Sequence, residues 1–232
     1  MSSPEAEAVR ARYERRKTSV ERDRYSALNG EVWQSMHERQ RVMLRFFARR
    51  GLVNFDGTRL LEIGCGGGSN LLEFLRLGFR PENLGGIELL EDRVALANRV
   101  LPSGIVRGGD ALRVAVEPSS WDIVFQSVVF SSILDLTVQQ ELAARMWTML
   151  KPGGGILWYD FTFDNPNNPD VRGIPTRRLR ALFPEGHPTC WRVTLAPPLA
   201  RRVCKIHSGL YPAFNAFPFL RTHVLAWIEK PA

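Results

Sequence analysis

Three glycines at alternating positions follow an apolar stretch that contains a carboxylate. In LLEIGCGGGSN, Glu62 lies two residues before Gly64, and Gly66 and Gly68 follow at every second position. Glycine lets the backbone turn sharply and lets a ligand approach with no Cβ in the way. Ser69 then opens a helix-like stretch, so the pattern predicts a strand, a tight turn and a helix with its electropositive end at the turn. We expect a small ligand here.

Two further acids follow later apolar stretches, at positions that suit a nucleoside. Glu88 ends the run NLGGIE, with Leu89 behind it, and Asp110 follows GIVRGG and precedes Ala111 and Leu112. A carboxylate at a strand end can accept hydrogen bonds from both hydroxyls of a ribose. The alternatives are a helix-capping acid for Glu88 and a loop-capping aspartate for Asp110.

The glycine turn is compatible with two cofactors, a dinucleotide and S-adenosylmethionine. Gly64, Gly66 and Glu88 together resemble the fingerprint that binds the phosphates and ribose of NAD. Glu62, however, would lie near the pyrophosphate of a dinucleotide, whereas it suits an ammonium and a sulfonium. The third dinucleotide glycine is replaced by Ser69, and KPGGG precedes a later strand. We therefore predict S-adenosylmethionine as cofactor and S-adenosylhomocysteine as its product.

The elements that position these residues alternate between short apolar runs and helix-like segments. Repeated strand and helix units favour an α/β fold, a doubly wound parallel sheet with helices on both faces. The predicted strands are 59–63, 83–89, 104–108, 121–128, 154–161, 190–196 and 222–229. The predicted helices are 4–17, 31–50, 69–77, 91–100, 137–150 and 176–183.

A length of 232 residues allows one sizeable domain with decorations. We expect an N-terminal helical cap over 1–50 and a main domain over 51–232, with insertions on the substrate side at about 162–189 and 197–220. Tyr13, Tyr25 and Arg39 of the cap would form a lid over the cofactor, and ordinary helix packing is the alternative. The oligomeric state is left open.

The joint set of motifs resembles the class I S-adenosylmethionine-dependent methyltransferase superfamily over about residues 58–161. LLEIGCGGG matches its first motif, Glu88 in GIELL its ribose-binding acid, and GGDAL its third-strand acid. WDIVFQSVVF and LKPGGGILWYDF match its fourth and fifth strands. The resemblance implies a Rossmann-like seven-stranded sheet of order 3-2-1-4-5-7-6, whose last strand, the THVLAWIE run, is antiparallel.

The resemblance also implies which residues hold the cofactor. The backbone around the glycine turn would face the methionine part, Glu88 the ribose, the segment after Asp110 the adenine, and the end of the fourth strand the sulfonium. The cofactor-binding residues implied in this way are Glu62, Gly64, Cys65, Gly66, Ser69, Glu88, Leu89, Asp110, Ala111, Leu112, Gln126 and Ser127.

The acceptor is less well defined by the sequence. The fourth strand ends in FQSVVFSS and lacks both the Asn/Asp-Pro-Pro-aromatic motif of base-amine methyltransferases and the Pro-Cys of cytosine-carbon enzymes. The terminal segments are similar to bacterial methyltransferases found with glycosyltransferases in surface-polysaccharide and glycolipid pathways. This similarity implies a small-molecule or glycan acceptor, methylated at a sugar hydroxyl. Because a hydroxyl is a poor nucleophile, a general base is expected, with His187, His207 and Asp160 as candidates.

The uneven distribution of charged residues along the sequence is compatible with two other functions. Residues 1–50 carry 12 Lys/Arg against 7 Asp/Glu, 51–170 carry 9 against 15, and 171–232 carry 10 against 2. Basic ends could hold RNA phosphates, which would make the protein an RNA methyltransferase, although no RNA-binding module is recognisable. A third possibility is a non-catalytic, cofactor-binding partner subunit.

One C-terminal segment could contact a membrane surface. FNAFPFL lies near Arg201, Arg202 and Lys205, a combination that suits an anionic bilayer. A buried insert that packs on the sheet is the preferred interpretation, because Pro212 and Pro218 interrupt any long amphipathic helix.

Other site classes have no support in the sequence. No window approaches a membrane span, and the N-terminal residues lack the apolar core of a signal peptide, so we expect a cytoplasmic protein. Three cysteines at unrelated spacings indicate no disulfide framework. The four histidines have no HxxxH or HExxH spacing, and we predict no metal site.

Overall fold

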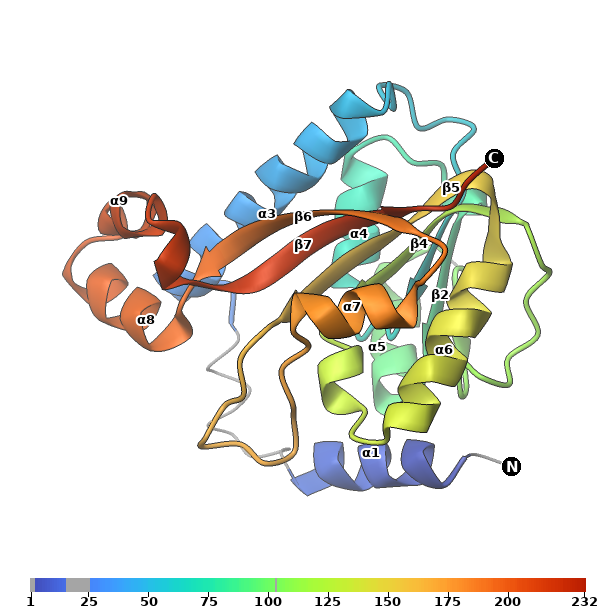
Figure 1. The fold of residues 1–232 in the computed structure, drawn as a ribbon, viewed down its shortest axis with the longest axis horizontal. Helices are drawn as coiled ribbons and strands as arrows, with labels where there is room; N and C mark the ends of the chain where they lie inside the picture. The colour runs from blue at the N-terminus through green and yellow to red at the C-terminus, as the bar shows by residue number, and fades with distance from the viewer. Residues whose placement is uncertain (1–2, 16–25, 103) are drawn as a thin grey trace.

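The computed structural model describes residues 3–15, 26–102 and 104–232. At its centre is a seven-stranded sheet of order β3-β2-β1-β4-β5-β7-β6, in which only β7 runs antiparallel to its neighbours (Figure 1). The predicted topology is therefore confirmed. The strands are β1 (Leu60–Ile63), β2 (Leu84–Glu88), β3 (Val106–Gly108), β4 (Trp121–Ser127), β5 (Leu150–Phe161), β6 (His187–Leu195) and β7 (Arg221–Glu229).

Helices cover both faces of the sheet. One apolar cluster joins the sheet to α3 (Gly30–Arg49), α4 (Ser69–Arg76) and α5 (Glu91–Val100), and a second joins it to α6 (Leu136–Met149) and α7 (Thr176–Leu182). Strands such as β1 are buried on both faces and therefore read as continuous apolar runs. The remaining elements are α1 (Pro4–Arg15), η1 (Pro81–Asn83), η2 (Phe130–Ser132), α8 (Pro197–Ile206), α9 (Leu210–Asn215) and η3 (Pro218–Leu220).

Strand direction decides which residues meet at the functional edge. The parallel strands β1 to β5 end at one edge of the sheet, beyond which sites of open α/β sheets form. Because β7 is antiparallel, its first residues, Arg221 to His223, lie at this same edge, where His223 pairs with Phe161 at the end of β5. We call this the carboxyl edge.

Two helices with different surroundings lie in the described part of the expected 1–50 cap. Phe46 and Phe47 of α3 are fully buried in the core, and no described helix is long and apolar enough to cross a membrane. On the same helix, the buried Glu38 accepts hydrogen bonds from the Thr194 N–H (2.9 Å) and the Tyr211 hydroxyl (3.0 Å). α3 is thereby fastened to β6 and α9, which fixes the helix beside the carboxyl edge.

Replacing Tyr211 with phenylalanine tests this anchor. The substitution removes the donor to Glu38 and leaves the Leu195 N–H, which donates to the Tyr211 oxygen at 3.2 Å, without its acceptor. Because these groups are buried, we expect Tyr211→Phe to lower the free energy of unfolding by about 1–3 kcal/mol in urea denaturation. Phe214→Leu, at an exposed position of α9, is the control, and equal stability of the two variants would show that the anchor contributes nothing.

The insertion between β6 and β7 folds differently from the preferred prediction. α8, α9 and η3 form a projection at one end of the molecule (Figure 1). Tyr211 is buried inside it, but Phe217 and Phe219 are 52% and 74% exposed. The prediction of a buried insert is therefore wrong for these aromatic side chains, because the insertion packs on β6 through Tyr211 and leaves Phe217 and Phe219 outside this contact.

Candidate functional site

The glycine turn has the geometry of a backbone-lined binding loop. The N–H groups of Gly64 and Cys65 donate to the Ile87 carbonyl oxygen at 2.8 and 3.2 Å, which holds the turn against the end of β2. Gly64 and Gly66 have φ angles of 66° and 56°, values that favour glycine. A Cβ on Gly64 would lie 2.5 Å from a methyl group of Val129, whereas a Cβ on Gly66 would meet nothing within 4 Å. The backbone at Gly66 is therefore open to a ligand.

Glu88 is positioned by this turn. It is 4% exposed, and its two oxygens accept hydrogen bonds from the Gly66 N–H (2.7 Å) and the Leu90 N–H (2.9 Å). The carboxylate thus joins the glycine turn to the start of α5. Each carboxylate oxygen has more than one lone pair, so both can also accept from a ligand hydroxyl.

Glu62 is a buried acid with one oxygen left unpaired. Its Oε1 accepts a hydrogen bond from Asn70 Nδ2 (2.6 Å), and its Oε2, which is buried, has no partner within the described chain. Burial raises the pKa of Glu62 to about 8, and the Asn70 hydrogen bond and the nearby Arg39 charge only partly oppose this shift. An unpaired buried carboxylate is costly, and a cationic group on a ligand would supply its missing partner.

Arg39 reaches this site from α3. Its guanidinium donates to Asn70 Oδ1 (2.6 Å) and to Ser127 Oγ (3.1 Å) and lies 4.9 Å from the centre of the Tyr159 ring. It connects the Glu62 side of the site to the ends of β4 and β5.

The end of β4 is locally strained. Gln126 is fully buried, and its amide donates to the Tyr159 carbonyl (3.2 Å) and accepts from the Val129 N–H (3.0 Å). Val128 has a φ of 55°, a conformation that β-branched residues rarely adopt. Strain of this kind collects at functional sites. The hydrogen bonds of Gln126 therefore stabilise the turn after β4, and the next residue, Ser127, accepts the hydrogen bond from Arg39.

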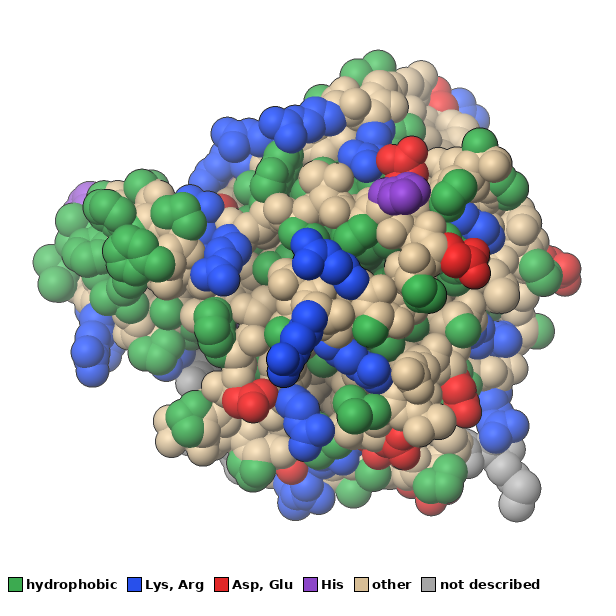
Figure 2. All heavy atoms as spheres, in the orientation of Figure 1, with side chains coloured by type: hydrophobic (Ala, Val, Ile, Leu, Met, Phe, Trp, Pro, Cys, Tyr) green, Lys and Arg blue, Asp and Glu red, His purple; other side chains and the backbone are tan. Residues whose placement is uncertain are grey.

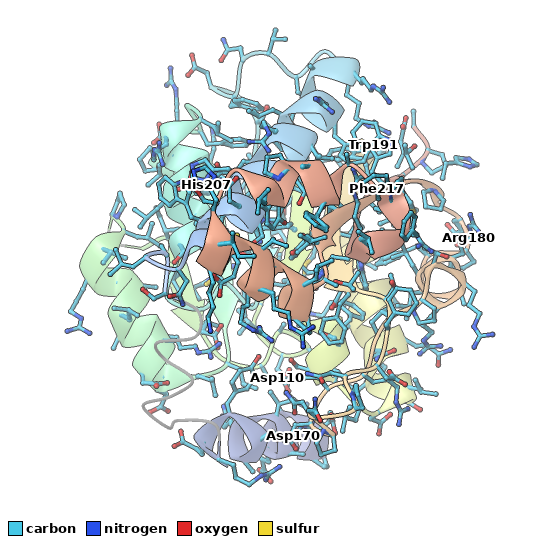
Figure 3. All side chains as sticks on the ribbon, turned by 90° about the vertical axis from the view of Figure 1, so that its left-hand side faces the viewer. Asp110, Asp170, Arg180, Trp191, His207 and Phe217 are labelled. Carbon is cyan, nitrogen blue, oxygen red and sulfur yellow. The ribbon has the colours of Figure 1, made fainter. Side chains whose placement is uncertain are left out.

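Helix α1 covers the side of the site formed by β2 and β3. The Ser3 N–H donates to Asp110 Oδ2 (3.3 Å), and Arg10 donates to the Leu89 carbonyl oxygen (3.5 Å). The other Asp110 oxygen accepts from the Leu112 N–H (2.9 Å), so this acid also caps its own loop. Figure 3 shows Asp110 directly beside α1.

The same helix contacts the segment that follows β4. Arg12 pairs with Glu5 and donates to the Ser132 carbonyl oxygen at 3.2 Å, and Glu5 accepts from the Leu134 N–H at 2.9 Å. α1 therefore bridges the loops after β2, β3 and β4 across the carboxyl edge.

The residues expected to form a lid are found in different places. The Tyr13 hydroxyl lies 3.3 Å from Ser132 Oγ, and Arg15 pairs with Asp170 at 2.9 Å (Figure 3). Tyr25 lies outside the described residues. Arg39 is inside the site rather than above it.

A group of polar side chains, which we call the acceptor-side cluster, lies beyond β4. It consists of Arg39, Tyr159, Thr194 and His223. The Tyr159 hydroxyl lies 2.9 Å from Thr194 Oγ1, and the Tyr159 ring stacks on the His223 ring with centroids 5.0 Å apart. Burial and the Arg39 charge lower the pKa of His223 to about 3, so its imidazole is neutral at pH 7. His223 Nδ1 contacts Thr222 Oγ1 (3.0 Å), and Nε2 has no hydrogen bond within the described residues.

The three candidate bases do not lie together. His187 begins β6 and pairs with Glu229, so it lies at the sheet edge opposite the glycine turn. His207 follows α8 on the projecting insertion, exposed, where its Nδ1 accepts the Gly209 N–H (Figure 3). Asp160 is fully buried near the end of β5, and burial raises its pKa to about 7. It accepts the Ser131 N–H at 3.1 Å and so supports the loop after β4.

The structure brings the predicted cofactor residues to one edge. They differ in exposure: Cys65 is buried, and burial raises the pKa of its thiol, whereas Ser69 is exposed at the start of α4. Three further side chains, Asn70, Arg39 and His223, lie in or beside the site. Asn70 and His223 were not predicted there, and Arg39 was predicted in a lid over the cofactor rather than beside Asn70 and Ser127. For His223 a signal was available, because an antiparallel last strand must start at the carboxyl edge.

These residues fit S-adenosylmethionine on two observations of the site itself. The unpaired Glu62 oxygen lacks a cationic partner, and the open backbone at Gly66 lies next to an acid that can accept from a diol. Within the described residues, no three His, Cys, Asp or Glu side chains come together to hold a metal ion.

Comparison with known proteins agrees with this fit. Residues 61–158 match the methyltransferase-domain family. A curated relative, the ubiquinone biosynthesis O-methyltransferase of Chelativorans sp. (strain BNC1), is 30% identical over 164 residues, which cover 61% of this chain and 62% of the relative. The match thus spans less than two thirds of that enzyme.

Solved structures share the fold at low identity. A S-adenosylmethionine-dependent methyltransferase from Archaeoglobus fulgidus superposes with a TM-score of 0.59 at 18% identity, covering 83% of this chain and 94% of that one. The phosphoethanolamine N-methyltransferase 2 of Haemonchus contortus, crystallised with S-adenosyl-L-methionine, gives 0.59 at 19% identity, covering 82% and 52%. These likenesses concern the arrangement of the sheet and its helices.

Proposed function

We propose that this chain, which carries a S-adenosylmethionine-dependent methyltransferase domain, methylates a hydroxyl oxygen of a small molecule. The domain match, the seven-stranded fold and the curated O-methyltransferase relative support the proposal. Its main structural support is the unpaired, buried Oε2 of Glu62, next to a glycine turn that is open at Gly66.

The proposed cofactor site uses the two acids differently. Glu62 would bind the cofactor ammonium, because its buried Oε2 has no hydrogen-bond partner within the described residues. Glu88 would accept from the ribose hydroxyls, and the segment from Asp110 to Leu112 would contact the adenine. Bound S-adenosylmethionine supplies an electrophilic methyl group on a sulfonium. The protein then has to aim an oxygen at that methyl group and exclude water.

The acceptor-side cluster is where we place the acceptor hydroxyl. His223 is neutral at pH 7, so its Nε2 can accept a hydrogen bond from a hydroxyl and orient its oxygen, whereas a pKa of about 3 makes the ring a weak base. Arg39 is a fixed positive charge 4.9 Å from the Tyr159 ring, so it would stabilise negative charge that develops on the acceptor oxygen. His223 therefore replaces His187, His207 and Asp160 as the residue proposed to hold the acceptor hydroxyl.

Two acceptor classes follow from different observations. The terminal segments suggest a sugar hydroxyl on a glycan or glycolipid, and the curated relative is named for O-methylation in ubiquinone biosynthesis. Both are hydroxyl acceptors, so the proposal is common to them. The site has no feature that favours RNA over a small molecule.

The test separates cofactor binding from methyl transfer. Calorimetric titration with S-adenosylmethionine and, separately, with NAD is expected to show saturable binding of the former alone. Transfer of a radiolabelled methyl group is then measured to nucleotide sugars, glycolipids and phenols, with amines and RNA for comparison. Label on a hydroxyl acceptor that is lost in His223→Ala, with cofactor affinity unchanged, is the expected result.

Other outcomes contradict specific parts of the proposal. Binding of NAD alone would overturn the methyltransferase assignment, and label on RNA or an amine would overturn the hydroxyl acceptor. Cofactor binding with no transfer to any of these acceptors would favour a partner subunit.

A further inference from the structure

The projecting insertion exposes a contiguous set of large apolar side chains. The residues, which we call the tip patch, are Ile206, Phe214, Phe217 and Phe219, and they are 78%, 38%, 52% and 74% exposed. Figure 2 shows hydrophobic side chains gathered at this end of the molecule, over α8 and α9, and Figure 3 shows Phe217 and His207 on the same outward side. Apolar groups gathered in this way commonly mark a binding surface.

The exposure of the aromatic rings does not result from poor packing of the insertion. Its inner side is well ordered against β6, with Ala200, Val203 and Tyr211 at most 4% exposed. The Tyr211 hydroxyl is hydrogen bonded to Glu38, so α9 is held in place. The outward phenylalanines are therefore presented on a fixed base, and the chain gains no packing energy from their exposure.

Basic side chains accompany the tip patch, and acidic ones are absent from the same segment. No aspartate or glutamate occurs between Glu185 and Glu229. α8 carries Arg202 and Lys205, both exposed, next to the partly exposed Arg201. Apolar and aromatic side chains bordered by lysine and arginine suit an anionic bilayer, where the rings enter the interface and the cations meet lipid phosphates.

The basic residues of α8 argue against a second copy of the chain as the partner that covers the tip patch. A two-fold contact through this patch would place Arg201, Arg202 and Lys205 of one molecule near those of the other. Such like charges repel, whereas an anionic surface attracts them. We propose that the tip patch docks the protein onto an anionic lipid membrane.

The tip patch lies on the same side of the molecule as the acceptor-side cluster. The insertion leaves β6 after Leu195 and enters β7 at Arg221, so both of its ends lie at the carboxyl edge. His223 is two residues from Arg221. A membrane held at the tip patch would therefore lie on the side of the molecule that holds the acceptor-side cluster. The docking itself does not depend on the proposed reaction.

Vesicle co-sedimentation of the full chain tests the proposal. We expect the protein to pellet with vesicles of phosphatidylcholine containing about 30% phosphatidylglycerol, to pellet less with phosphatidylcholine alone, and to be released by about 0.5 M salt as charges are screened. Phe217→Ser/Phe219→Ser and Arg202→Glu/Lys205→Glu are each expected to reduce the bound fraction at least fivefold.

Matched controls change the same chemistry elsewhere. Leu136→Ser/Phe163→Ser alters two apolar side chains that are 50% and 54% exposed, and Arg99→Glu/Arg113→Glu makes the same change of charge on exposed positions. Both are expected to bind like the native chain. The proposal is overturned if the native protein does not pellet, or if tip and control variants pellet equally. It is also overturned if the native chain dimerises in solution and the tip substitutions abolish that dimer without changing vesicle binding.

Discussion

The affinity for S-adenosylmethionine is expected to rise about tenfold per pH unit between about pH 6 and pH 8. The cause is Glu62, whose pKa burial raises to about 8 in the free protein. A cationic group at its unpaired oxygen favours the ionised form, so binding has to remove the proton. The complex therefore forms with release of up to one proton below pH 8, and the affinity stops rising once Glu62 is ionised in the free protein.

Calorimetry in two buffers of different ionisation enthalpy measures this proton directly. In Glu62→Gln the side chain cannot ionise, so we expect an affinity that no longer depends on pH in this range and that is at least tenfold weaker than native at about pH 8. Asp110→Asn, with an acid changed elsewhere in the site, should keep the native pH dependence. An affinity of the native protein that stays constant with pH, with no proton released, would show that Glu62 does not meet the cofactor cation.

Glu62 also makes the free energy of unfolding depend on pH, in the direction opposite to that of the cofactor affinity. In the free folded protein Glu62 stays protonated up to about pH 8, whereas in the unfolded chain it ionises above its ordinary value of 4.5. The folded state therefore binds more protons in this interval, and its free energy of unfolding falls as the pH rises through it. Saturating cofactor removes this loss, because it stabilises the ionised form.

Replacing Glu88 with alanine is expected to have the second large effect. The substitution removes the proposed acceptor for the ribose hydroxyls and also the acceptor of the Gly66 and Leu90 N–H groups. A charged hydrogen-bond acceptor contributes roughly 1.5–3 kcal/mol, which corresponds to roughly a tenfold to hundredfold loss of cofactor affinity. Because Glu88 also holds the glycine turn to α5, we expect a lower melting temperature as well.

A milder variant separates these two contributions. Glu88→Gln keeps an oxygen for one backbone N–H, so its stability should lie nearer to native while its cofactor affinity remains low. Glu91→Ala, at an exposed position of the same loop and helix, is the control and should bind normally. Native-like affinity of Glu88→Ala in calorimetric titration would remove Glu88 from the cofactor site.

Local sequence patterns were sufficient for the sheet and the glycine turn. The run from Leu60 to Ser69 determines its own strand, turn and helix, because positive φ angles at Gly64 and Gly66 are accessible chiefly to glycine. The order of strands came from the joint motif resemblance. The exposure of Phe217 could not be predicted, since it depends on how α8 and α9 turn over β6 rather than on any local pattern.

Long-range packing explains the site residues that the sequence did not reveal. Arg39 reaches Asn70 and Ser127 only because α3 packs on the sheet, and no motif connects these three positions. The local sequences around His187 and His223 do not reveal where the two side chains lie, but strand direction places them at opposite edges. Which histidine lies at the carboxyl edge was therefore a question of topology.

The bridge that α1 makes across the carboxyl edge bears on the timing of turnover. Ser3, Glu5 and Arg12 hydrogen bond to the loops after β3 and β4, next to the residues that we propose face the cofactor. We expect a nucleotide bound beneath this helix to exchange with solvent only after those bonds open together. Product departure would then set the steady-state rate, and rapid mixing of the loaded enzyme with its acceptor would produce a burst of one methylated molecule per site before slower cycling.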